Sequence, residues 1–178
     1  DAPLAAACDA VVANADAAAP LVAGVRRSPL AAMVFVQLLR ASEKLPLADA
    51  LVAESLAYAT LQNGPEFRAW RETATLPPPS ADDDGPAVRI ERDDAVLHLT
   101  LNRPSNRNGM TIEMRDALCE ALQLALADAA IAQVELRGRG KCFSTGGDLR
   151  EFGSAPDPAT AHLVRSLALP GRLLAACA

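Results

Sequence analysis

Aromatic side chains are scarce in this sequence: they make up only 3% of its 178 residues, and there is a single tryptophan and a single tyrosine. Apolar residues nevertheless account for 51% of the chain. A hydrophobic core can therefore form, but it must be built mainly from Ala, Leu and Val. The length is enough for one domain, or for one domain with an appendage.

Long apolar runs and basic clusters are also missing. No stretch reaches the length of a transmembrane helix, and the N-terminus carries Asp1, Asp9 and Asp16 in place of the basic residues that open a secretory signal. The net charge is −5, and the arginines are scattered along the chain. Nucleic-acid-binding proteins usually gather basic residues on one face. We therefore expect neither a membrane nor a nucleic acid as a partner.

Metal-binding and disulfide patterns are absent as well. The four cysteines, Cys8, Cys119, Cys142 and Cys177, form no Cys-x-x-Cys pair. Neither histidine stands near them at the spacing of metal ligands. This pattern is typical of free thiols in a reducing compartment. It predicts a cytoplasmic protein without a metal centre.

Residues 1–75 are predicted to form an all-helical module. Pro20 should close the first helix, Ser28 should cap the second, and Pro29 fits its first position because a proline there loses no hydrogen bond. Phe67 and Trp70 are the expected docking anchors of a short helix that begins at Pro65. The four expected helices cover residues 2–19, 28–44, 45–62 and 65–74.

Residues 76–86 are predicted to be a linker, because three prolines favour an extended backbone and three aspartates repel one another. Residues 87–178 then differ from the preceding helical pattern, because they combine β-prone runs with helical segments. Two β-prone runs around Asp93-Asp94 predict a hairpin, a helix is expected over residues 111–129, and a short strand over 133–138. A last helix should begin near Ala159. The order strand, strand, helix, strand indicates an α/β layer fold.

The predicted strand over residues 96–101 places apolar groups on both of its faces. Leu97, Leu99 and Leu101 alternate with Val96, His98 and Thr100. We therefore expect both faces of the sheet to be covered.

The segment GRGKCFSTGGDLREF, residues 138–152, holds the residues most suggestive of chemistry. Gly146 and Gly147 allow a sharp turn and a close approach of a ligand to the backbone. Asp148 stands where a helix N-cap is expected. Backbone N–H groups at such a turn can stabilise a carbonyl oxygen as it becomes an oxyanion. A plain strand-to-helix turn would have the same sequence, so the segment alone leaves both interpretations open.

Two motifs at a suitable separation make residues 87–178 resemble the N-terminal half of the crotonase (enoyl-CoA hydratase/isomerase) superfamily. The family pattern V…ItLNRP…NA is similar to Val96–Pro104 with Asn108-Gly109, and the pattern G…FsaGxDl is similar to Phe143–Leu149. The resemblance implies a crotonase-like (ClpP/crotonase) core of ββα type, incomplete in this chain and preceded by the all-α module.

The resemblance also implies roles for single residues. Gly147 matches the position that supplies one oxyanion-hole N–H. Arg150 matches a position where a basic side chain often lies near the CoA phosphates, and Asp148 is expected to act as a turn and cap residue. The positions implied to line the CoA site are Ser144, Thr145, Gly146, Gly147, Asp148, Leu149 and Arg150, together with the loop Ser105, Asn106, Arg107 and Asn108.

Other parts of the family's site are not matched. The second oxyanion N–H and the catalytic glutamates come later in family members, and the resemblance implies that they lie beyond Ala178. The acidic residues Glu113, Glu120, Glu135 and Glu151 are interpreted as solvated or structural, and His98 and His162 as packed or surface residues. Residues 1–75 resemble the C-terminal helices of the same family, which suggests a permuted arrangement or a fused copy, although any amphipathic helical pair has this pattern.

The resulting expectation is an acyl-CoA-processing enzyme, most simply an enoyl-CoA hydratase, with a CoA thioester as substrate and no permanently bound cofactor. Isomerase, hydrolase, dehalogenase and cofactor-independent oxygenase chemistries share the same motifs and stay open. So do a non-catalytic CoA-binding or assembly module and a helical interaction protein. The family resemblance implies a homo-oligomer, either a trimer or a hexamer.

Overall fold

The computed structural model describes residues 5, 7–76 and 83–177, which form two compact units, residues 1–74 and residues 75–178. The predicted linker, residues 76–86, falls largely on residues 77–82, which lie outside the described residues. The division into a helical module, a linker and a crotonase-like half-core therefore stays a prediction.

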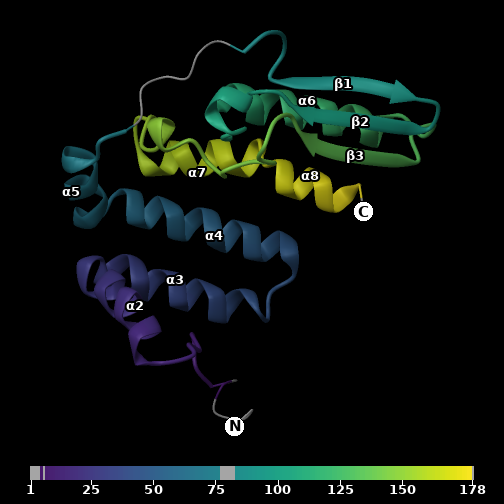
Figure 1. Ribbon diagram of the computed structural model, residues 1–178. Helices are drawn as coiled ribbons and strands as arrows, with labels where there is room; N and C mark the ends of the chain where they lie inside the picture. The colour runs from purple at the N-terminus through teal and green to yellow at the C-terminus, as the bar shows by residue number, and fades with distance from the viewer. Residues whose placement is uncertain (1–4, 6, 77–82, 178) are drawn as a thin grey trace. The chain divides into compact units, whose positions relative to one another are not determined.

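The described part of the first unit contains α2 (Ala15–Arg27), α3 (Pro29–Ser42), α4 (Leu47–Gln62) and α5 (Pro65–Thr73) (Figure 1). The last three helices confirm the predictions. The first prediction is wrong, because residues 7–14 are not helical and Pro20 lies inside α2. Asn14 starts this helix, since its side chain accepts a hydrogen bond from the Ala17 N–H at 2.9 Å. Pro20 is the sixth residue of α2, so it removes one intrahelical hydrogen bond without ending the helix.

The predicted cap of α3 is also wrong. Ser28 occupies the cap position, but its side chain makes no capping hydrogen bond. The N–H groups of Leu30 and Ala31 instead donate to the two carboxylate oxygens of Glu66 on α5, at 2.8 and 2.9 Å. A carboxylate at a helix N-terminus satisfies open donors and interacts favourably with the helix dipole.

Little of the first unit is removed from water. Among its described residues only Ser55 and Ala59, both on α4, are buried. The rings of Phe67 and Trp70 stack on each other, with centroids 5.5 Å apart. Large apolar side chains remain exposed on α2, α3 and α4. They include Leu21, Val25, Met33, Phe35, Leu39 and Leu56.

The second unit contains a three-stranded sheet in the order β1 (Val88–Asp93), β2 (Val96–Leu101), β3 (Gln133–Gly138). β1 and β2 form the predicted hairpin, whose turn is one residue later than expected, at Asp94-Ala95. β2 and β3 run parallel, and α6 (Ile112–Ala127) connects them, as Figure 1 shows. The strand and helix predictions for this region, and the mixed α/β class, are confirmed.

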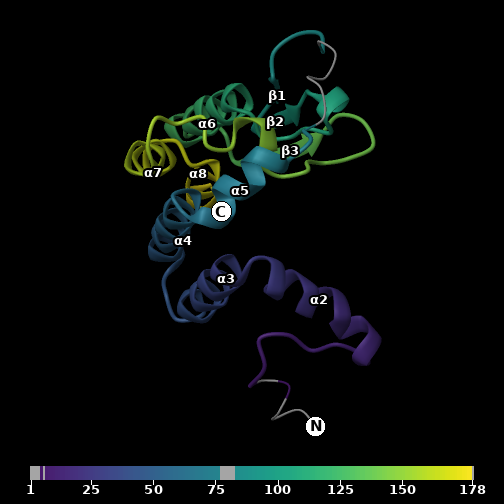
Figure 2. The same cartoon turned by 90° about the vertical axis from the view of Figure 1, so that its left-hand side faces the viewer.

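The core of the second unit lies between the sheet and α6. Leu97, Leu99 and Leu101 of β2 are buried, and Met114 and Leu122 of α6 meet them. Residues of α8 (Pro170–Ala176) pack on the same core, and Figure 2 shows α6 and α8 on one side of the sheet. The other face is only partly covered by the described residues, since Val96, His98 and Thr100 keep some exposure. The expectation of two covered faces is wrong, because polar side chains dominate that face.

Three short helices complete this unit. Two are 3-10 turns, Pro104–Asn106 after β2 and Leu149–Glu151 after the Gly-Gly-Asp segment, and α7 (Pro158–Leu167) begins one residue before the predicted Ala159.

Within the described ranges, no single helix is both long and apolar enough to cross a membrane. The helices α2 and α3 meet that criterion of length and composition only as a pair, bent by 109° at the break between them.

Candidate functional site

The parallel pairing of β2 and β3 brings the two sequence motifs together. Leu101, the last residue of β2, is paired with Gly138, the last residue of β3. Parallel strands end at the same edge of a sheet, so the loop 102–110 and the loop 139–148 leave the sheet side by side. The candidate site is built from these two loops.

Glycines shape the second loop where it folds back on its own strand. A Cβ at Gly138 would lie 2.4 Å from the carbonyl oxygen of Phe143, so no other residue fits without moving the backbone. Gly146 has a φ of +81°, in the left-handed region that glycine adopts without strain. The predicted sharp turn is therefore present.

Asn108 ties the two loops to each other. Its side chain is fully buried, and its amide donates to the carbonyls of Arg139 and Cys142, both at 2.9 Å. Its Oδ1 accepts from the Arg103 N–H at 2.9 Å. The residue itself has a φ of +54°, which asparagine tolerates better than most residues. Because these side-chain groups are engaged and buried, Asn108 positions the loops; its predicted contact with CoA stays a prediction.

Gly147 lies beside Met110 in an isolated parallel bridge. The Met110 N–H donates to the Gly146 carbonyl at 2.8 Å, and the Asp148 N–H donates to the Met110 carbonyl at 3.2 Å. In this pattern the residue between the two bonded neighbours turns its own N–H and C=O to the opposite side. Within the described residues the N–H of exposed Gly147 has no hydrogen-bond acceptor. A carbonyl oxygen could therefore bind there.

Phe152 limits the side chain that position 147 can carry. A Cβ at Gly147 would lie 2.8 Å from Cε1 of the Phe152 ring. The ring thus packs directly over the glycine Cα. Phe152 was expected only in the first turn after Asp148, and its contact with Gly147 was missed because that contact depends on the turn between them.

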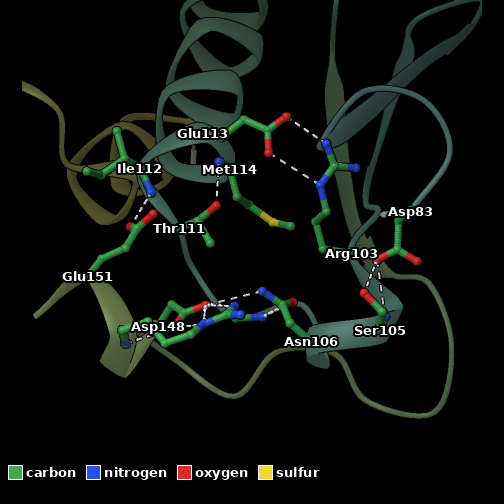
Figure 3. A network of polar contacts seen from close by, with 12 residues as sticks. Asp83, Arg103, Ser105, Asn106, Thr111, Ile112, Glu113, Met114, Asp148 and Glu151 are labelled. Atoms are coloured by element: carbon green, nitrogen blue, oxygen red, sulfur yellow. Dashed lines mark hydrogen bonds and ion pairs between the residues drawn. The ribbon is translucent and has the colours of Figure 1, made fainter. Parts of the chain in front are cut away.

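Asp148 and Arg150 form an ion pair next to the Gly147 turn. Asp148 accepts from the Arg150 backbone N–H at 2.9 Å and from two nitrogens of its guanidinium. The Asn106 amide approaches the same carboxylate at 3.4 Å, as Figure 3 shows. The bonds to Arg150 lower the pKa of Asp148, and Asp148 in turn raises the pKa of Arg150. Asp148 is the predicted cap, here of a 3-10 turn.

Glu151 reaches across to the first turn of α6, where its carboxylate accepts from the Ile112 N–H at 2.6 Å (Figure 3). Thr111 caps the same helix through a bond from the Met114 N–H at 3.2 Å. Glu113, in that first turn, pairs with Arg103 at 2.6 Å. The structural interpretation of Glu113 and Glu151 is confirmed.

The remaining predicted site residues surround the turn. Ser105 donates from its hydroxyl to Asp83 at 2.5 Å, and Asn106 accepts from the Gly109 N–H at 3.0 Å. Arg107 is exposed, and its guanidinium has no hydrogen-bond partner in the part of the chain that the structure describes. Thr145 and Leu149 are exposed on the other loop.

The other candidate acids and bases lie elsewhere. His98 Nδ1 is 3.2 Å from Glu135 across neighbouring strands, and Glu135 also binds Arg137. Glu120 is exposed on α6. Across residues 5, 7–76 and 83–177, no three His, Cys, Asp or Glu side chains gather in a way that could hold a metal ion.

A family model, curated proteins and solved structures all point to the same family. The family model described as enoyl-CoA hydratase/isomerase matches residues 96–164, which include every predicted site residue. A trans-2-decenoyl-[acyl-carrier-protein] isomerase of Streptococcus mutans is 38% identical over 65 residues, 36% of this chain and 25% of that protein. The 2,3-dehydroadipyl-CoA hydratase of Escherichia coli is 33% identical over 76 residues, 43% of this chain and 30% of that protein.

Among solved structures, an enoyl-CoA hydratase from Mycobacterium tuberculosis aligns with 40% of this chain and 28% of its own, at 31% identity and a TM-score of 0.39. The chain spans about a quarter to a third of the length of the curated relatives it matches. The matched region, residues 96–164, carries both loops of the site, and it is this part of the chain that is similar to the enoyl-CoA hydratase/isomerase family of the crotonase superfamily.

Proposed function

We propose that this chain supplies one oxyanion-hole donor, the N–H of Gly147, to an enzyme that processes acyl-CoA thioesters. The observation that carries the proposal is the bridge to Met110, which uses the neighbours of Gly147 and leaves its N–H open. A preorganised N–H that faces a developing oxyanion stabilises it strongly, because the donor needs no reorientation during the reaction.

Enoyl-CoA hydration is the simplest reaction for this site. Water would add its oxygen to C3 of the enoyl thioester and a proton would reach C2, while negative charge passes through the thioester oxygen. The N–H of Gly147 would hold that oxygen. The proton transfers need an acid–base group, and we assign none within this chain.

The CoA portion would run along the two loops. Arg107 is the better candidate for a CoA phosphate, because it is exposed and unpaired within the described residues, whereas Arg150 is bound to Asp148. Thr145, Gly146 and Leu149 would line the path. We further propose that no other cofactor is bound, that the assembly is a trimer or hexamer, and that the protein is cytoplasmic; these points rest on the family resemblance and the cysteine pattern.

A non-catalytic CoA-binding or assembly module is the second candidate. The acidic side chains around the turn, Asp148, Glu151 and Glu113, already accept structural hydrogen bonds (Figure 3). A carboxylate engaged in this way is less available for proton transfer. This observation favours binding without turnover.

The test is a titration of the ¹⁵N-labelled chain with crotonyl-CoA and, separately, with free CoA. We expect the Gly147 amide resonance to shift with crotonyl-CoA only, because free CoA has no thioester carbonyl. Loss of the enoyl absorbance would show turnover, and binding without it would support the module. No response of Gly147 to crotonyl-CoA would refute the oxyanion assignment.

Gly147→Pro is the matching variant, because proline has no backbone N–H. Where the wild type turns over crotonyl-CoA, we expect a loss of about 100-fold or more. Gly147→Ala is the control, because it places the same Cβ 2.8 Å from Cε1 of Phe152 but keeps the backbone N–H. If the site variant fails to fold, the amide titration of the wild type still decides the question.

A further inference from the structure

The hydroxyl of Ser144 lies at the centre of the contacts that hold the Gly147 turn. Its Oγ donates to the Asn108 carbonyl at 2.7 Å and accepts from the Gly146 N–H at 3.1 Å. Ser144 is partly buried. Both hydrogen-bonding directions of this hydroxyl are therefore used within the fold, although the family resemblance implied that Ser144 lines the CoA site.

These two bonds extend the bridge on both sides of Met110. The Asn108 carbonyl is joined to loop 139–148 through Ser144, and the Met110 N–H and carbonyl are joined to it through Gly146 and Asp148. The two segments thus run side by side from Asn108 to Met110. The Gly147 N–H lies between the last two contacts and takes its direction from them.

The segment that Ser144 binds is itself fixed. The side chain of Asn108 is fully buried and bonds to both loops, and its backbone N–H donates to the Arg103 carbonyl at 2.8 Å. A hydrogen bond to a rigid acceptor restricts its donor more than a bond to a mobile one. Gly146, in contrast, has no Cβ and has a left-handed φ, so the turn has little local stiffness without the bond to Ser144.

We infer that Ser144 is a positioning residue for the Gly147 N–H, acting through the Asn108 carbonyl and the Gly146 N–H, and not a contact of CoA. This inference rests on the proposed function of Gly147. It predicts that removal of the hydroxyl loosens the donor while the fold and the CoA contacts are retained. Catalysis or acyl recognition would then fall without a matching loss of affinity for free CoA.

The experiment compares Ser144→Ala with the conservative Ser144→Thr, which keeps a hydroxyl. Ser166→Ala is the matched control, because Ser166 donates to the His162 carbonyl at 2.8 Å in α7, away from the site. Each ¹⁵N-labelled protein is titrated with crotonyl-CoA and with free CoA. The ¹⁵N heteronuclear NOE of Gly147 is also measured without ligand.

For Ser144→Ala we expect the preference for crotonyl-CoA over free CoA to fall about threefold to tenfold, the equivalent of one hydrogen bond, and the NOE of Gly147 to drop. Ser144→Thr should restore both values, and Ser166→Ala should change neither. A general structural defect would lower affinity for both ligands alike.

Two results would overturn the inference. One is a wild-type preference and a wild-type Gly147 NOE in Ser144→Ala. The other is a reduced affinity for free CoA equal to that for crotonyl-CoA, which would make Ser144 a CoA contact. If the Gly147 amide resonance of the wild type does not shift with crotonyl-CoA, the proposed function fails. The heteronuclear NOE measured without ligand then decides whether Ser144 orders the turn.

Discussion

The two units of this chain have similar helix-forming patterns but bury very different amounts of apolar surface. In residues 1–74 the described part buries only Ser55 and Ala59, whereas residues 75–178 bury a cluster that includes Leu97, Leu99, Leu101 and Leu122. A sheet face opposed by a helix encloses side chains from both layers. Neighbouring helices alone cover only the stripe where they meet. Helical periodicity therefore predicts secondary structure better than it predicts burial.

The two units nevertheless share one kind of helix-capping contact. A glutamate from a distant segment binds first-turn N–H groups of a helix in each: Glu66 at α3 and Glu151 at α6. The helix α6 also has its own cap, Thr111, while Ser28 makes no capping bond to α3. We therefore expect α3 to depend more on its glutamate than α6 does.

The largest expected effect is the loss of stability when a leucine is truncated to alanine in each of the two units. Leu99→Ala should destabilise the second unit by about 3 kcal/mol, because Leu99 is fully buried and its loss leaves a cavity. Leu56→Ala, at a half-exposed position of α4, should cost less than about 1 kcal/mol. Amide hydrogen exchange under increasing urea measures each unit separately. Equal losses would show that the first unit has a core that its exposure does not reveal.

A smaller effect concerns the two glutamates. Glu66→Gln should cost about 1 kcal/mol, because both carboxylate oxygens accept a bond and an amide keeps only one acceptor. Glu151→Gln should cost less, since a single oxygen accepts from Ile112. Exchange rates of the Leu30, Ala31 and Ile112 amides report the loss at each helix. The comparison fails if α6 is weakened as much as α3.

The ion pairs of the two units should differ in their response to acid. Bonds to Arg150 lower the pKa of Asp148 in the folded state, so the pair stabilises the fold above about pH 4, the range of an unfolded aspartate, and this contribution is lost as pH falls through the lowered pKa. Asp148→Asn should remove up to about 1 kcal/mol at pH 7 and flatten that decline.

Asp9→Asn is the matched variant in the first unit, where Asp9 pairs with Arg40 at the surface. Its pKa is also lowered by Arg40, but solvent screens an exposed pair. We expect no measurable change in stability between pH 3 and pH 7. Urea unfolding across this range tests both variants, and a pH-independent effect of Asp148→Asn would contradict the assignment.

The last and smallest expected effect is a difference in the labelling rates of two thiols, one in each unit. Burial raises the pKa of Cys119 in α6, which lowers its reactive thiolate fraction at neutral pH, whereas Cys8 is exposed. Iodoacetamide should therefore modify Cys8 well before Cys119 in the native protein, and at a similar rate in urea. Mass spectrometry of peptides gives both rates. Equal native rates would indicate that the core around α6 opens readily.

Local sequence patterns predicted most of the secondary structure, because they depend on neighbouring residues. The alternation in Leu97, Leu99 and Leu101 identified β2, and Gly and Pro marked several helix ends. The errors arose where a local preference met a competing one. Pro20 was expected to end a helix but lies inside α2, and Asn14, which caps that helix, was overlooked.

The sequence by itself determined the resemblance to the family and the order of the elements, because motifs and periodicity are written in contiguous residues. Through that resemblance it also singled out Gly147, whose role stays a prediction. Only the tertiary structure decided which groups are free to act. The contacts of Ser144 with Asn108, of Glu151 with Ile112 and of Glu66 with Leu30 join residues 36 to 39 positions apart. Such pairs meet only when two parallel strands end together or two helices cross, and no local pattern specifies that meeting.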